Sequence, residues 1–141
     1  MAITFQAEGI TLPKIKKRET ANWIKTVANN YHRKVGEIAY LFCDDEKILA
    51  INRTFLQHDY YTDIITFDYS EEDTISGDIF ISIDTVHSNS HKYQTDYEEE
   101  LHRVIIHGIL HLCKVNDQLE EEEKEMRAAE NSALILLKKR E

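Results

Sequence analysis

The spacing of apolar residues divides the chain into nine segments of regular structure. Short apolar runs predict strands over residues 2–6, 36–43, 63–68 and 78–83. Helical spacing predicts helices over residues 13–32, 44–56, 84–93, 97–113 and 119–139. Pro13 suits a first helical turn, and Asp44 or Asp45 can cap the second helix. Strands and helices mixed in this order predict an α/β (α+β) fold with a small, mixed four-stranded sheet and about five helices.

The composition is that of an ordinary globular domain. The chain has 141 residues, of which 42% are hydrophobic and 30% charged, and no linker or repeat interrupts it. We therefore expect residues 1–141 to form a single domain. No apolar run approaches the roughly 18 residues of a membrane span, and the N-terminus lacks the pattern of a secretory signal. With only two distant cysteines, Cys43 and Cys113, we expect a cytoplasmic protein without a membrane partner.

The charge is acidic overall but unevenly distributed. Seventeen basic and 26 acidic residues give a net charge of −9, which by itself argues against a nucleic-acid-binding protein. Residues 1–40 carry seven basic and three acidic residues, a balance of +4, and the remainder carries −13. The basic segment is either a solvated surface or a face for an anionic partner.

Residues 102–117 concentrate the chemistry. His107 and His111 are four residues apart, so a helix places both imidazoles on one face, where they can bind one metal ion. Asp117 follows after enough residues for the helix to end and the chain to turn back. Two histidines and a carboxylate form a common zinc site that leaves a position for water. Asp117 could instead cap the next helix.

Gly108 follows the first histidine of this pair. In zinc peptidases with an HExxH motif, a glutamate at this position acts as the general base, so Gly108 argues against a peptidase. Glycine within a helix costs about 1 kcal/mol relative to alanine. We expect a close approach of another backbone, or of a substrate, to account for it.

Three ordered motifs carry a family resemblance. The HGILHL run at 107–112, with an aligned position at 117, resembles the HGxLHLxGYDH signature of the YbeY family. The IN pair at 51–52, followed by TDIITF at 62–67, is similar to the LN and TDVLSF segments of that family. GDIFIS at 77–82 resembles its GDI strand. The three motifs span residues of about 36–117, most of the chain.

The resemblance implies a metal-dependent endoribonuclease specific for single-stranded RNA. Its expected role is ribosomal RNA maturation, in late small-subunit processing, and ribosome quality control. The implied partners are ribosomal RNA and the ribosome or a ribosomal protein, with no DNA. It implies one zinc ion at the end of a central helix, held by His107, His111 and Asp117, with His107 and His111 as the catalytic residues.

Two departures from the family pattern affect these expectations. The third ligand is a histidine in most members, and Asp117 in its place lowers the net charge of the zinc site from +2 to +1. Water bound there should be less acidic, and manganese becomes more compatible. The family also carries an arginine for RNA where this chain has Leu56. We hypothesise that Arg53, nearly on the same helix face, contacts the phosphate instead; otherwise it is a solvated surface residue.

Arg103 is a further candidate for binding substrate. It lies one helical turn before His107 and could contact a phosphate near the metal, or pair with Glu99 or Glu100. The residues do not identify a general base; His58 and Asp78 are unassigned possibilities. Two alternative functions remain: a ribosome-associated maturation factor with a structural metal and little catalysis, and a zinc hydrolase acting on a small molecule or peptide.

Overall fold

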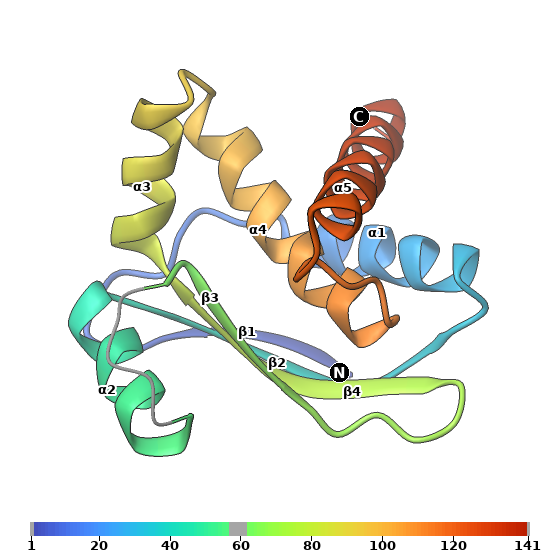
Figure 1. Ribbon diagram of the computed structural model, residues 1–141, viewed down its shortest axis with the longest axis horizontal. Coiled ribbons are helices and arrows are strands. Elements are labelled where there is room, and N and C mark those ends of the chain that lie inside the picture. The colour runs from blue at the N-terminus through green and yellow to red at the C-terminus, as the bar shows by residue number, and fades with distance from the viewer. Residues whose placement is uncertain (1, 57–61, 141) are drawn as a thin grey trace.

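The computed structural model describes residues 2–56 and 62–140 (Figure 1). Its elements, in chain order, are β1 (Ile3–Ala7), α1 (Lys17–Asn30), β2 (Lys34–Cys43), α2 (Asp45–Phe55), β3 (Ile64–Asp68), β4 (Thr74–Ser82), α3 (Ile83–Lys92), α4 (Tyr97–Leu112) and α5 (Glu120–Arg140). The predicted α+β fold, with a four-stranded sheet and five helices, is confirmed.

The sheet is mixed, with strand order β1-β2-β4-β3. β1 and β4 both run parallel to β2, and β3 pairs antiparallel with β4. The pairing of Ile64 with Ile81 and of Asp68 with Gly77 sets the register of β3 against β4. This arrangement puts Asp63, just before β3, beside the end of β4 that leads into α3.

The two faces of the sheet have separate cores. Helices α1, α3, α4 and α5 lie on one side of the sheet, and α2 lies on the other (Figure 1). Ile79 and Ile81 of β4 alternate with Phe80, so they join the large core that includes α4, while Phe80 packs with the small core beneath α2. The small core includes Ile48 and Ile65.

Most predicted boundaries agree with the structure to within about two residues, but two were wrong by four residues. The first helix begins at Lys17 rather than residue 13, because Leu12 and Ile15 pack against the core from a non-helical segment. The last strand begins at Thr74 rather than residue 78 and includes Gly77. Within the strand, Gly77 lies close to the Phe67 carbonyl oxygen on the paired strand. Glycine fits at this position because any side chain there would clash with that oxygen.

Gly108 of α4 faces the sheet. A Cβ atom built there would lie 3.0 Å from Cδ1 of Ile79 and 3.2 Å from Cδ1 of Ile64. The expected close approach is therefore present, but it is to isoleucine side chains and not to a backbone or a substrate. This contact seats α4 closely on β3 and β4, with His107 beside the start of β3.

Candidate metal centre

His107 and His111 lie one turn apart near the C-terminal end of α4, as the sequence predicts. Their ring centroids are 4.5 Å apart. The helix ends at Cys113, and Lys114 adopts a left-handed conformation with φ of +72°. Bonds from Lys114 N to His111 O and from Val115 N to Leu110 O close this end and turn the chain back.

The reversal brings Asp117 to the two imidazoles. Its Oδ2 atom lies 3.3 Å from Nε2 of His107 and 3.3 Å from Nε2 of His111. One ligand atom from each residue lies within 4.8 Å of the other two, so the three side chains could hold one metal ion. At the start of α5, the Leu119 N–H donates to Glu122 Oε1. The carboxylate of Asp117 thus faces the histidines, while Glu122 serves the helix start.

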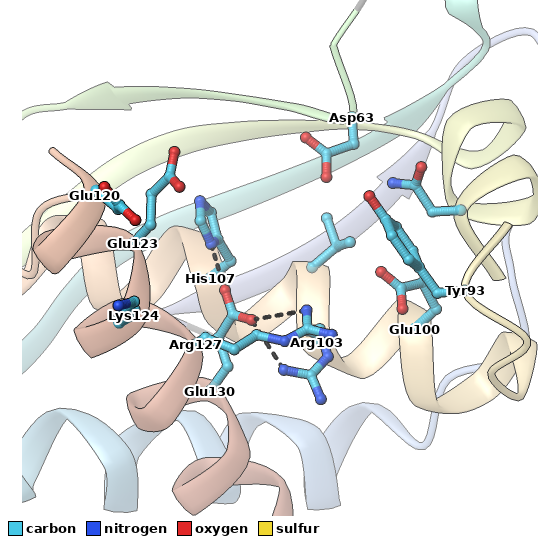
Figure 2. Close-up of a pocket in the computed structure, with 12 residues that line it drawn as sticks. Asp63, Tyr93, Glu100, Arg103, His107, Glu120, Glu123, Lys124, Arg127 and Glu130 are labelled. Carbon is cyan, nitrogen blue, oxygen red and sulfur yellow. Dashed lines mark hydrogen bonds and ion pairs between the residues drawn. The ribbon is translucent and has the colours of Figure 1, made fainter. Parts of the chain in front are cut away.

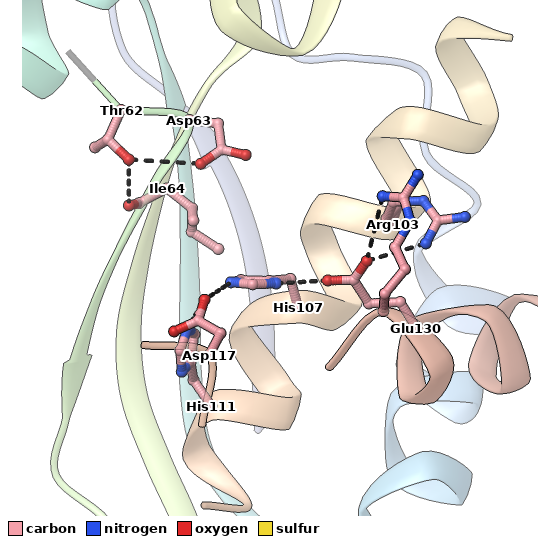
Figure 3. Close-up of polar contacts among 9 residues, drawn as sticks. Thr62, Asp63, Ile64, Arg103, His107, His111, Asp117 and Glu130 are labelled. Atoms are coloured by element: carbon pink, nitrogen blue, oxygen red, sulfur yellow. Dashed lines mark hydrogen bonds and ion pairs between the residues drawn. The ribbon is translucent and has the colours of Figure 1, made fainter. Parts of the chain in front are cut away.

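Glu130 of α5 holds His107 from the other side. Its Oε2 lies 2.6 Å from His107 Nδ1, and its Oε1 is 3.0 Å from Nη1 of Arg103 (Figure 3). Because a carboxylate only accepts hydrogen bonds, Nδ1 must carry the proton, and Nε2 of a neutral ring is then left to bind a metal. Arg103 also donates to Asn131 Oδ1 at 2.8 Å.

The pKa values of the two histidines shift in opposite directions. Burial alone would lower the pKa of His107, but the hydrogen bond and the charge of Glu130 outweigh burial and raise it above 6.5. The pKa of His111 is lowered by burial and by the neighbouring His107. Burial opposes ionisation of Glu130, yet its bonds to His107 and Arg103 lower its pKa. Glu130 is therefore a buried carboxylate that remains charged.

Asp63 faces the same site from the loop before β3. It lines a pocket of about 540 Å³ together with His107, Arg103 and Glu130 (Figure 2). Burial raises the pKa of Asp63, with the charge of His107 acting in the opposite direction. The hydroxyl of Thr62 lies 3.5 Å from Asp63 Oδ1 and 3.4 Å from the Ile64 carbonyl oxygen. Thr62 and Asp63 thus shape the entry to β3, and Asp63 also presents a carboxylate to the pocket.

The structure separates the two arginines predicted to bind substrate. Arg103 lines the pocket at His107, but its partner is Glu130 and not Glu99 or Glu100. Arg53 is exposed in the last turn of α2, on the opposite side of the sheet from α4, as is Leu56 at the C-cap of that helix. As phosphate contacts, both arginines remain predictions.

Of the two unassigned candidates for a general base, the structure describes only Asp78, which does not join the cluster. Asp78 shares the face of β4 that carries Phe80, away from α4, and accepts a hydrogen bond from the Tyr69 hydroxyl at 3.3 Å. His58 lies outside the described residues.

Both cysteines are free and buried, and burial raises the pKa of Cys43 to about 12 and that of Cys113 to about 11. Cys113 belongs to the core and is not part of the cluster of metal ligands.

Glu130 was missed by the sequence analysis, although a signal for it exists. It falls between Met126 and Ala133 on the apolar stripe of α5, a position where a charged residue is buried only if it is paired.

Among residues 2–56 and 62–140, no helix has the length and apolar character needed to cross a membrane.

Comparisons with known proteins agree with the three motifs. The family model described as endoribonuclease YbeY matches residues 3–138. The endoribonuclease YbeY of Bacteroides fragilis is 64% identical over 138 residues, which cover 98% of this chain and 99% of the relative. That of Bacteroides thetaiotaomicron is 60% identical over 136 residues, covering 96% and 99%. The solution structure of TM1509 from Thermotoga maritima is similar with a TM-score of 0.68 and 25% identity, covering 96% of this chain and 88% of that one.

Proposed function

Because this chain belongs to the endoribonuclease YbeY family, we propose that it is a zinc-dependent endoribonuclease that cleaves single-stranded RNA. The observation that carries the proposal is the convergence of His107, His111 and Asp117 beside an open pocket. We assign its role to ribosomal RNA maturation in the cytoplasm, in late small-subunit processing and ribosome quality control. Its partners are then ribosomal RNA and the ribosome or a ribosomal protein.

The donor set suits zinc. Tetrahedral zinc with bonds of about 2.0–2.1 Å to nitrogen and oxygen keeps its ligand atoms roughly 3.3–3.4 Å apart. The two distances from Asp117 Oδ2 to the histidine Nε2 atoms, 3.3 Å each, match that separation. A zinc ion bound there would polarise a phosphoryl oxygen and lower the pKa of bound water. With three protein ligands, one coordination position stays available to water or substrate.

The protein's own residues prepare this site. Glu130 fixes the proton of His107 on Nδ1 and thereby aims Nε2 toward Asp117. Arg103 offsets the buried charge of Glu130 at 3.0 Å. These contacts hold His107 in the orientation that metal binding requires, so the ring would not need a large rearrangement to bind the ion.

Asp63 is the residue we assign to proton transfer. Its carboxyl group faces the pocket beside His107, and burial raises its pKa above the usual value for an aspartate. A group with a raised pKa can hold a proton for the leaving oxygen of the RNA, or accept one from the attacking oxygen. Gly108, in contrast, packs against Ile79 and Ile64, which disfavours a peptidase because no base occupies that position.

One observation supports the alternative of a maturation factor with little catalysis. The family arginine is replaced by Leu56, and Arg53 lies on the opposite side of the sheet from the metal ligands. In that case the metal would be structural, and the protein would bind the ribosome without cutting RNA.

Single-turnover cleavage of ribosomal RNA fragments tests the proposal against this alternative. The wild-type protein should cut single-stranded segments and leave duplex segments intact, and both His111→Ala and Asp117→Ala should abolish cleavage. Cleavage that persists in both variants would contradict the proposal and point to a contaminating nuclease. Absence of cleavage by the zinc-loaded wild type, with co-sedimentation with ribosomes preserved, would favour the maturation factor.

A further inference from the structure

The pocket at His107 extends well beyond the metal ligands. Its far end is lined by Asn89 and Tyr93 of the α3 segment, with Asp63 between Tyr93 and His107 (Figure 2). Its volume of about 540 Å³ lies within the range of small-molecule sites. Metal binding and the proton transfer assigned to Asp63 account for one end of this pocket only.

Tyr93 is held in place at the far end. It is the C-cap of α3, and its N–H donates to Asn89 O at 2.9 Å. The turn that follows is closed by a bond of 2.9 Å from Thr95 N to Ser90 O, with Gln94 in the left-handed region at φ of +54°. The side chain of Tyr93 is nevertheless 53% exposed. Nζ of Lys92 lies over the ring, 5.3 Å from its centroid. An exposed aromatic ring on a fixed turn is a suitable stacking surface because little conformational freedom is lost when a ligand binds.

The groups around Tyr93 select a neutral ligand that can donate hydrogen bonds. Asn89 lies one helical turn before Tyr93 and supplies an amide, and Val104 supplies an apolar surface. The buried carboxylate of Glu100 also lines this end. Five carboxylates and three arginine or lysine side chains line the whole pocket, so its far end suits a neutral group better than a second phosphate group. A flat ring with N–H groups at its edge fits both the tyrosine and the acceptors.

We propose that the far end of this pocket is a nucleobase subsite, which takes one unpaired base next to the scissile phosphate by stacking on Tyr93. Asn89 and Glu100 would bind the edge of that base. The inference rests on the proposed function and deepens it by explaining single-strand specificity. A base in a duplex is stacked and paired, so it cannot turn into a pocket beside the metal ligands without the helix opening.

Single-stranded RNA oligonucleotides with one abasic nucleotide, moved stepwise around the cut, test the subsite. For wild type, one abasic position should lower kcat/KM at least about fivefold, the lower end of what a stacked base contributes. Tyr93→Ala should lower kcat/KM for the intact RNA by a similar factor. It should not lower kcat/KM for that abasic RNA any further. Tyr93→Phe should retain wild-type cleavage because the ring remains. Tyr69→Ala is the matched control, since Tyr69 is 59% exposed and lines neither this pocket nor the one at His111.

Thermal unfolding of each variant shows whether the fold is retained, and Tyr93→Leu provides a second variant that keeps apolar volume without stacking. Equal cleavage of intact RNA by wild type, Tyr93→Ala and Tyr93→Leu would overturn the subsite. The subsite would also be overturned if the loss of kcat/KM from Tyr93→Ala and the loss from the abasic position multiply when the two changes are combined. The two changes would then act independently. If the zinc-loaded wild type cuts no RNA, the proposed function itself fails, and the subsite with it.

Discussion

Replacing Glu130 with glutamine perturbs the metal centre without touching a ligand. Glu130 is 5% exposed and joins two groups, His107 Nδ1 at 2.6 Å and Arg103 Nη1 at 3.0 Å. Glutamine has nearly the same shape but carries no charge and only one acceptor oxygen. It can accept from either His107 or Arg103, and its NH₂ group then faces the other donor.

The expected magnitudes follow from these contacts. Loss of a partner that orients a metal-binding histidine typically lowers metal affinity about 10- to 100-fold, or roughly 1.4–2.7 kcal/mol. Removing one member of a buried ion pair typically lowers the free energy of unfolding by about 3–5 kcal/mol. We expect the lower end, about 3 kcal/mol, because Asn131 still accepts a bond from Arg103 at 2.8 Å.

Zinc affinity, measured by competition with a chelating dye at about pH 8, checks this prediction. An alkaline pH reduces competition between protons and zinc for the histidines, so the measurement reports mainly the orientation of the ligand. Glu125→Gln is the matched control, since it removes the same charge from an exposed position of α5. A Glu130→Gln protein that is folded and binds zinc as tightly as the wild type would refute the argument that Glu130 positions His107.

Three further predictions concern the pKa of His107, proton transfer by Asp63 and RNA binding by Arg53. Zinc affinity should fall as the pH is lowered through the raised pKa of His107, beginning above pH 6.5, because a protonated ring cannot bind metal. Zinc titrations at several pH values check this, and a loss of affinity that begins only below pH 6.5 would contradict the raised pKa. Asp63→Asn should lower the single-turnover rate of RNA cleavage about 10²- to 10⁴-fold with zinc content unchanged; an unaltered rate would remove Asp63 from proton transfer. Arg53→Ala should weaken RNA binding and reduce the slope of log affinity against log salt by about one; unchanged RNA cleavage and an unchanged slope would make Arg53 a surface residue.

The ligand set could be predicted from the sequence because its spacing is local. His107 and His111 share a helix face by the geometry of the helix alone, and Asp117 follows within six residues. The turn between them carried no such signal. Lys114 occupies a left-handed conformation in which glycine is usual. The interval of six residues before Asp117, and not the local residue types, indicated that the helix could end and the chain turn back here.

The groups around the ligands could not be predicted because tertiary packing brings them together. Glu130 reaches His107 from a helix 23 residues further along the chain. Asp63 enters the pocket because β3 pairs antiparallel with β4 beneath α4. Its place just before a strand suggests only a turn position, which describes its local structure but not the carboxylate that it presents to the pocket. Similarly, helical spacing alone could not indicate that Leu12 and Ile15 reach the core from outside α1.

The most direct test of the central claim is the single-turnover rate of RNA cleavage as zinc is added back to metal-free protein. If His107, His111 and Asp117 hold one catalytic ion, the rate should rise in proportion to zinc up to one equivalent and then remain constant. The metal-free protein should be inactive, and zinc should not restore His111→Ala. Full cleavage by the metal-free wild-type protein would contradict the account.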